Sequence, residues 1–204
     1  MTDEHLRLFD IFISELIEWN NRINLTGLTE RKRILNELFL DSLIPAPHIP
    51  EKGRMLDVGS GAGFPAIVIK IYHPRLKIRL LEAKSKKVNF LKQVIRLLKL
   101  QDVEASKGRI ERDFSNLYEE GFQLITARAV AGPDQIISWC SSLLSPEGFL
   151  ICFLGVNSSE TLKKIIPLGK KNALEIDRII PYTLPGKCSM RKIAIFKKDF
   201  VRNP

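Results

Sequence analysis

The residues with the clearest chemical potential are a glycine-rich turn and a carboxylate that follows it. The turn runs Leu56-Asp57-Val58-Gly59-Ser60-Gly61-Ala62-Gly63-Phe64-Pro65. Its glycines let a ligand approach the backbone where a Cβ atom would collide, and the helix expected after the turn begins with free N–H groups. Glu82 lies 19 residues beyond Gly63, at the end of the next expected strand. A carboxylate there can accept both hydroxyls of a ribose, so the pair predicts a nucleoside-binding site.

The spacing of the glycines distinguishes two classes of cofactor. A dinucleotide site favours G-x-G-x-x-G, because its pyrophosphate lies on the helix N-terminus, whereas this chain has G-x-G-x-G. S-adenosylmethionine (AdoMet) has no phosphate, but its ammonium needs an acceptor, and Asp57 can serve directly or through water. We therefore predict an AdoMet site that includes Asp57, Gly59, Ser60, Gly61, Gly63, Phe64, Glu82 and Ala83.

Two further strand ends are expected to line the same cleft. Gly108-Arg109-Ile110-Glu111 follows the third expected strand, on the side where the adenine is expected. Ala127-Arg128-Ala129 ends the fourth, on the side where a methyl acceptor would approach. Arg128 stands between small residues at the end of an apolar strand, so we interpret it as functional rather than as a surface arginine.

The elements that must position these residues alternate between strands and helices. Helices are expected at 3–20, 29–42, 65–72, 86–99, 132–144 and 160–169, and strands at 55–58, 78–82, 103–105, 124–127, 149–154, 175–181 and 192–196. This alternation predicts an α/β, Rossmann-like fold of the AdoMet-dependent methyltransferase type, a doubly wound and mostly parallel sheet whose last two strands form an antiparallel end. Prolines at 45, 47 and 50 separate an N-terminal helical extension, residues 1–50, from a methyltransferase core, residues 51–204.

Composition limits the partners and the compartment. Lysine and arginine number 32 against 23 acidic residues, a formal charge of +9 that attracts polyanions such as RNA. No apolar run approaches the roughly 20 residues of a membrane span, and the charged N-terminus does not look like a signal peptide. The three cysteines form an odd, sparse set without CxxC spacing, which argues against a disulfide framework and against a zinc site. A cytoplasmic monomer with no membrane partner is expected.

Taken together, these residues make the chain similar to a known family. It resembles the glucose-inhibited division protein B family, bacterial guanine-N7 methyltransferases of 16S ribosomal RNA. The resemblance is clear from Trp19 to about Gly155. It is carried by Trp19-Asn20, Asn24-Leu25-Thr26, Leu40-Asp41-Ser42, the turn from Asp57 to Pro65, Lys86-Lys87-Val88-x-Phe90-Leu91, Gly108-Arg109-Ile110-Glu111, Ala127-Arg128-Ala129 and Trp139-Cys140.

The resemblance implies AdoMet as cofactor and a guanine N7 of 16S ribosomal RNA, naked or in the small ribosomal subunit, as acceptor. It carries over to Gly59, Gly61, Gly63, Glu82, Ile110 and Glu111 as cofactor positions, with Arg109 after the third strand and Arg128 near the methyl group and the acceptor. The chain departs from the family pattern at three positions. Glu37 and Leu38 stand where the family often has Arg-His, and Leu154 stands where it usually has lysine.

Guanine N7 carries a lone pair and no proton, so methyl transfer to it requires no general base. The hypothesis for Arg128 is therefore that it positions the acceptor, by binding guanine O6 or a phosphate. Methylation at cytosine C5 would need a nucleophilic cysteine, usually after proline, and adenine amino-methylation generally uses an Asn/Asp-Pro-Pro-aromatic motif. The chain has neither.

Other readings stay open. They are an AdoMet methyltransferase for another acceptor, an NAD-dependent oxidoreductase and an RNA-binding or ribosome-assembly protein without catalysis. The basic clusters at 31–33, 84–87, 163–164, 170–171 and 197–198 are expected to act together in binding RNA, which would make that binding sensitive to salt.

Overall fold

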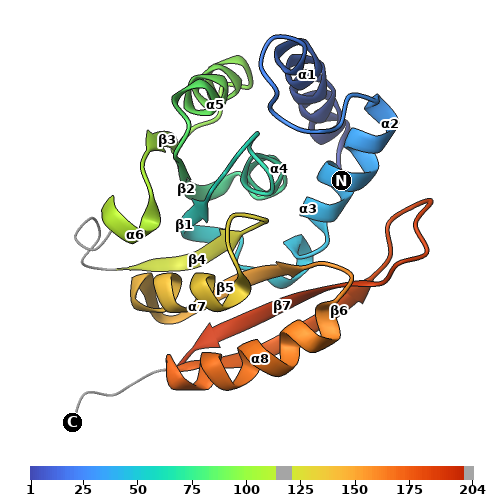
Figure 1. Cartoon of the computed structure of the whole chain (residues 1–204). Coiled ribbons are helices and arrows are strands. Elements are labelled where there is room, and N and C mark those ends of the chain that lie inside the picture. Colours follow the sequence, from blue (N-terminus) through green and yellow to red (C-terminus); the bar gives the residue numbers. More distant parts are fainter. Residues whose placement is uncertain (114–120, 200–204) are drawn as a thin grey trace.

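The computed structural model describes residues 1–113 and 121–199, which form a seven-stranded sheet between two layers of helices (Figure 1). The strand order is β3-β2-β1-β4-β5-β7-β6, and β7 runs antiparallel to both neighbours. The strands are β1 Lys52–Val58, β2 Arg75–Glu82, β3 Val103–Lys107, β4 Phe122–Ala127, β5 Leu144–Leu154, β6 Leu174–Tyr182 and β7 Arg191–Lys198. The predicted Rossmann-like methyltransferase fold and its antiparallel end are confirmed.

The two faces of the sheet bury two separate hydrophobic cores. One face is covered by α4 (Ala66–Tyr72), α5 (Ser85–Leu97) and α1 (Asp3–Asn20), the other by α7 (Pro133–Cys140) and α8 (Ser158–Lys171) (Figure 1). Side chains alternate between faces along a strand. In β7, Ile193 and Ile195 accordingly belong to the α1/α4/α5 core, while Ala194 and Phe196 belong to the α7/α8 core.

The N-terminal helices pack against the same core as the sheet. Phe12 of α1 is fully buried, and its ring stacks on Phe64 of the glycine turn with centroids 5.1 Å apart. The predicted helix over 29–42 is present as a continuous run of α2 (Arg31–Ile34), a π-helical segment η1 (Leu35–Leu40) and α3 (Asp41–Leu43), before the 3₁₀ turn η2 (Ala46–His48). Whether residues 1–50 form a separate unit stays a prediction.

Two local predictions were wrong in detail. The helix expected over 132–144 ends at Cys140 and continues only as the 3₁₀ turn η3 (Ser141–Leu143), because Leu144 already pairs with Phe122 in the sheet. Strand β5 therefore begins five residues earlier than its apolar run indicates. The one-turn helix α6 (Ile110–Asp113) after β3 was not predicted. In the described ranges, no helix is both long and apolar enough to cross a membrane.

Candidate active site

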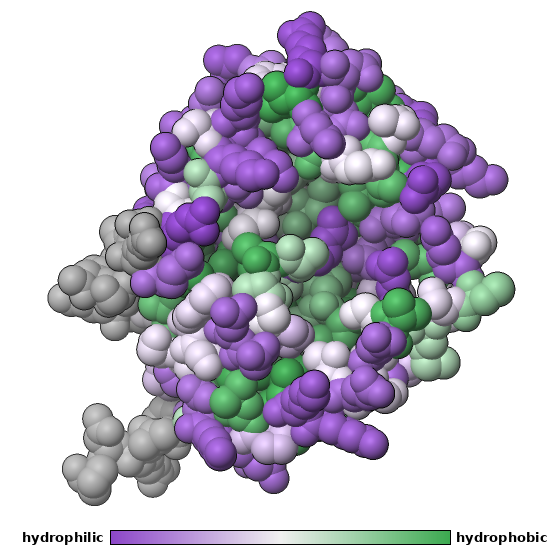
Figure 2. Space-filling view, viewed as in Figure 1, coloured by the Kyte–Doolittle hydropathy of each residue, from purple (hydrophilic) through white to green (hydrophobic). Residues whose placement is uncertain are grey.

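A cavity of about 690 Å³ opens at the carboxyl ends of β1, β2 and β4, where the strand order reverses. This is the position at which open α/β sheets bind ligands. The space-filling view shows the molecule hollowed at the middle of this face (Figure 2). The walls come from the glycine turn, the β2 end and the start of α5, the segment after β3, the β4 end and α7, with three N-terminal residues, Leu25, Thr26 and Leu38.

The glycine turn is held close to β2 and β4. The N–H groups of Gly59 and Ser60 both donate to the carbonyl of Leu81, at 2.8 and 3.0 Å. Gly59 has φ +68°, and a Cβ added to it would lie 2.1 Å from Cγ2 of Val130. Gly61 also has a left-handed φ of +58°, but a Cβ there would meet no atom closer than 3.8 Å and would extend into the cavity region. Gly59 is thus required for the packing of the turn against Val130, and Gly61 leaves the backbone of the turn accessible to a ligand.

We expect Gly59→Ala to lower both the stability of the protein and its AdoMet affinity. The new methyl group clashes with Val130 and the backbone must keep a left-handed φ, which for a non-glycine residue costs about 1–2 kcal/mol. Combining it with Val130→Ala removes the 2.1 Å contact with Cγ2 but leaves the contact with Cβ at 2.7 Å and the backbone cost. Thermal unfolding should therefore show partial recovery in the double variant. Equal melting temperatures of the single and double variants would contradict a steric cause.

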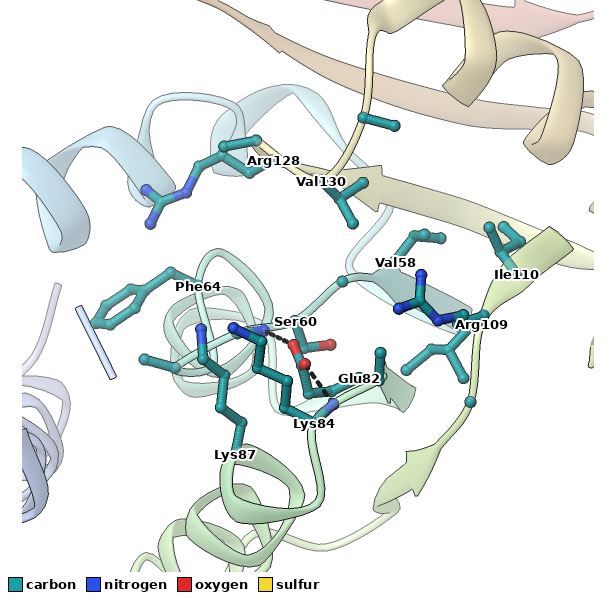
Figure 3. Close-up of a pocket in the computed structure, with 18 of the residues that line it drawn as sticks. Val58, Ser60, Phe64, Glu82, Lys84, Lys87, Arg109, Ile110, Arg128 and Val130 are labelled. Carbon is teal, nitrogen blue, oxygen red and sulfur yellow. Dashed lines mark hydrogen bonds between the residues drawn. The ribbon is translucent and has the colours of Figure 1, made fainter. Parts of the chain in front are cut away.

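Glu82 ends β2 with its carboxylate beneath the turn (Figure 3). Oε2 accepts the N–H of Gly61 at 2.9 Å and Oε1 accepts the N–H of Lys84 at 2.8 Å. Glu82 is only 7% exposed, yet it lines the cavity. Each carboxylate oxygen can accept more than one hydrogen bond. The two backbone donors therefore fix the carboxylate while leaving it able to accept hydroxyls of a ribose.

Asp57 lies deeper, within β1 in the middle of the sheet, opposite Thr126 of the neighbouring strand β4. Its Oδ1 accepts a hydrogen bond from the hydroxyl of Thr126 at 2.6 Å, whereas its buried Oδ2 has no hydrogen-bond partner within residues 1–113 and 121–199. Burial raises the pKa of the Asp57 carboxyl to about 6, against the hydrogen bond from Thr126, which lowers it, while the Ser60 hydroxyl donates to the main-chain carbonyl of Asp57 at 3.0 Å. A buried carboxylate oxygen without a hydrogen-bond partner favours a positively charged ligand group nearby, in direct contact or through a water molecule.

Basic side chains reach the cavity from three directions (Figure 3). Lys84 and Lys87 come from the start of α5, and Arg109 comes from the segment after β3, where its guanidinium lies 3.6 Å from the Glu111 carboxylate. Arg128 comes from the end of β4. Its guanidinium lies 5.5 Å from the centre of the Phe64 ring and donates to Asp41.

The structure brings together most of the residues that the sequence indicated. The predicted residues that line the cavity are Gly59, Ser60, Gly61, Phe64, Glu82, Ala83, Arg109, Ile110, Glu111 and Arg128. Asp57 and Gly63 are not in the lining. Asp57 lies within the sheet, and a Cβ on Gly63 would lie 2.7 Å from Ile67 of α4, so this glycine serves the packing of the turn.

The sequence did not predict several of the lining residues as site residues, although the family motifs that it contains include some of them. The added residues include Leu25, Thr26, Val130, Gln135 and Trp139. The Asn20 side chain explains the first two. Its Oδ1 accepts the N–H groups of both Leu25 and Thr26 at 2.9 Å and so holds this loop against the cavity. The sequence pattern that contains these residues is Trp19-Asn20 followed by Asn24-Leu25-Thr26. Its spacing alone does not show that this loop lies beside the cavity.

The donor set of this cavity fits AdoMet. Glu82 presents a fixed carboxylate at the end of β2, the position that suits ribose hydroxyls, and Gly61 leaves open space above the turn. Asp57 lies behind this lining with one buried oxygen that has no partner among the described residues, so its role toward the ammonium stays a prediction. The volume of about 690 Å³ lies within the range of pockets for small ligands and cofactors.

Known protein structures share this architecture. The ribosomal protein L11 methylase from Lactobacillus delbrueckii subsp. bulgaricus superposes with a TM-score of 0.62 at 18% identity, covering 85% of this chain and 81% of its own. M. jannaschii TYW2 in complex with AdoMet gives a TM-score of 0.61 at 12% identity, covering 78% of this chain and 71% of its own. At these identities the likeness concerns the fold alone.

Sequence comparison is more specific. Residues 5–186 match the family model described as rRNA small subunit methyltransferase G. The ribosomal RNA small subunit methyltransferase G of Alkaliphilus metalliredigens is 37% identical over 82% of this chain and 73% of its own length. The protein of that name from Brevibacillus brevis is 34% identical over 97% of this chain and 84% of its own. With its cavity, its glycine turn and these relatives, the chain belongs to the rRNA small subunit methyltransferase G family, also called GidB.

Proposed function

We propose that this chain transfers a methyl group from AdoMet to N7 of a guanine in 16S ribosomal RNA of the small subunit. The observation that carries the proposal is the cavity at the switch point, with Glu82 and the glycine turn on one side and Arg128 on the other, in a member of this family. AdoMet, when bound, supplies an electrophilic methyl group, and the residues of this chain provide the binding and the positioning.

The lining of the cavity suits an acceptor that needs no deprotonation. Glu82 is occupied by two backbone N–H groups, and the buried cysteines Cys140 and Cys152, whose pKa values burial raises, do not line the cavity. Guanine N7 requires only a fixed approach to the methyl carbon. Such positioning can supply about 7–11 kcal/mol of the barrier reduction. Arg128, at the edge of the cavity, is the residue proposed to hold the acceptor.

The charge around the opening supports an RNA substrate. Lys84, Lys87 and Arg109 line the same cavity, and the whole chain carries a formal charge of +9. Each phosphate neutralised by such side chains releases counterions, so binding should weaken as salt rises. A salt-independent affinity for RNA would contradict this role of the basic residues.

The proposal includes a monomeric enzyme in the cytoplasm. The three cysteines, two buried and one exposed, lack the spacing of a disulfide framework, which supports a reducing compartment.

The decisive test uses labelled AdoMet with small ribosomal subunits, and separately with naked 16S ribosomal RNA, from cells that lack this activity. Label transfer is followed by mass mapping of the modified nucleotide. We expect a single N7-methylguanine. Transfer to another base or to protein would contradict the proposed acceptor. Binding of AdoMet and RNA without transfer would favour a non-catalytic RNA-binding protein.

A further inference from the structure

A buried carboxylate joins the N-terminal helices to the carboxyl side of the sheet. Asp41 follows the π-helical segment η1 directly and is only 2% exposed. Its Oδ2 accepts Arg128 Nη1 at 3.1 Å, and its Oδ1 accepts the Tyr182 hydroxyl at 2.7 Å and Arg191 Nη1 at 3.2 Å. One side chain thus fixes the residue that follows β4, the last residue of β6 and the first residue of β7. π-helical turns are frequent at functional sites, which agrees with this placement.

Tyr182 acts as a hydrogen-bond donor in this cluster. Burial first, and then the neighbouring Asp41 charge, raise the pKa of the Tyr182 hydroxyl above its ordinary value. The phenol therefore keeps its proton at neutral pH and donates a hydrogen bond to Asp41. Both carboxylate oxygens are consequently satisfied by groups that hold their protons.

A second cavity, of about 490 Å³, lies on the other side of this cluster. Asp41, Arg128, Tyr182 and Arg191 line it, together with Phe153, Leu154 and Gly155 at the end of β5. Arg128, Ala129 and Ala131 line both this cavity and the proposed AdoMet cavity. The two spaces therefore meet at the end of β4, where a methyl group would pass from one to the other.

The charge of the cluster favours an electron-rich ligand. Two guanidinium groups share one carboxylate, so one positive charge remains on this wall. The carboxylate of Glu37, which also lines the second cavity, is itself paired with Arg33 at 2.8 Å and Lys187 at 3.3 Å. An arginine has five N–H donors, so Arg128 and Arg191 can each hold Asp41 and still donate to a ligand.

We propose that the second cavity receives the acceptor guanine nucleotide, and that Asp41 is the positioning residue that aims Arg128 and Arg191 at it. The inference rests on the proposed function and adds the acceptor's location. The buried carboxylate sets the direction of Arg128, while the guanidinium itself contacts the base or its phosphate. A displacement of about 1 Å at such a contact can cost about 10²-fold in rate.

Gly155→Trp tests the location of the acceptor. Gly155 is exposed, and a Cβ added to it would meet no atom within 4 Å, so a larger side chain can enter the cavity without disturbing the fold. We expect kcat/KM for small subunits to fall at least about tenfold, with AdoMet affinity within about twofold of the original chain. Gln101→Trp is the matched control, because Gln101 is exposed in the turn before β3 and lines neither cavity. Full activity of Gly155→Trp would overturn the proposal.

Asp41→Asn tests the positioning role. The amide keeps the size of the side chain but turns an N–H₂ group or a weaker acceptor toward Arg128. We expect kcat to fall about 10–100-fold at a temperature where the variant is fully folded, with AdoMet affinity unchanged. In an Arg128→Ala/Arg191→Ala background, the same substitution should cost less than about threefold, because both groups that Asp41 positions are gone. Multiplicative losses would reject the positioning role.

The outcomes separate this inference from the proposed function. If the unaltered chain transfers no methyl group, the proposed function fails, and filter binding of 16S ribosomal RNA then decides the inference. In that case Gly155→Trp and Asp41→Asn should still weaken RNA binding at least about fivefold relative to Gln101→Trp. Unchanged RNA binding would reject the second cavity as the site of the acceptor.

Discussion

Arg128→Ala is expected to reduce methyl transfer to small ribosomal subunits by about 10²–10³-fold, while the protein stays folded and binds AdoMet. The loss corresponds to the removal of a preorganised hydrogen-bond donor at the reacting group. Arg128 stands at the edge of the AdoMet cavity, whereas Glu82 and the turn form its centre (Figure 3). AdoMet affinity should therefore change less than about tenfold. Calorimetric titration and single-turnover transfer measure the two effects separately.

The control must remove a similar arginine elsewhere. Arg79 is suitable, since its side chain is 20% exposed, against 17% for Arg128, and it also pairs with a carboxylate, that of Glu104 at 2.9 Å. Arg79→Ala should lower the melting temperature without a specific loss of transfer. Arg128→Lys keeps a charge but not the planar fork, so we expect intermediate activity. An Arg128→Ala enzyme as active as Arg79→Ala would refute the assignment.

The parts of the site that the sequence predicts are local. The glycine turn and Glu82 lie in consecutive strand–turn–helix units, where a short pattern fixes both the backbone conformation and the position at the strand end. The alternation of elements also predicts the parallel sheet and its antiparallel end. Such features depend on neighbouring residues, so a single chain is enough to infer them.

The Asp41 cluster could not be predicted in this way. Its members come from α3, the residue after β4, β6 and β7, up to 150 residues apart, and only the strand order brings them together. Tyr182 in particular reads as an ordinary residue near the end of the chain. The early start of β5 has a similar cause. Leu144 belongs to the strand because it pairs with Phe122 of β4, and the local sequence alone does not indicate this pairing.

The three residues that depart from the family pattern all line one of the two cavities. Glu37 and Leu154 line the second cavity, and Leu38 lines the AdoMet cavity. Glu37 does not present a free negative charge to the acceptor, since Arg33 and Lys187 pair with it and lower the pKa of its carboxyl. The positive charge that faces the second cavity comes instead from Arg128 and Arg191.

The stability of the protein should fall as pH rises from about 4 to about 6, through the burial of Asp57. The pKa of this carboxyl is about 6 in the folded protein, against 3.8 for the exposed group. The folded state therefore binds the proton more tightly. Its contribution to stability is complete below pH 4 and is lost as pH passes 6, a loss of about 3 kcal/mol at 1.36 kcal/mol per pKa unit.

Asp57→Asn isolates this effect, because the amide has the same shape and no charge. The variant should match the original chain at pH 4 and exceed it in unfolding free energy by up to about 3 kcal/mol at pH 7. Denaturant unfolding at several pH values provides the comparison. Parallel stability profiles for the two proteins between pH 4 and 7 would contradict the raised pKa.

The same charge that destabilises the fold is expected to serve AdoMet binding. Oδ2 of Asp57 has no hydrogen-bond partner among the described residues, and although Asp57 does not line the cavity, the positive charge of an ammonium bound nearby would favour the ionised carboxylate. AdoMet affinity should then fall as pH drops below about 6, by up to about tenfold per pH unit, and Asp57→Asn should lose both the affinity and its pH dependence. Calorimetry between pH 5 and 8 tests this. A variant that is more stable yet binds AdoMet as tightly as the original chain would show that the buried charge has no role in the cofactor site.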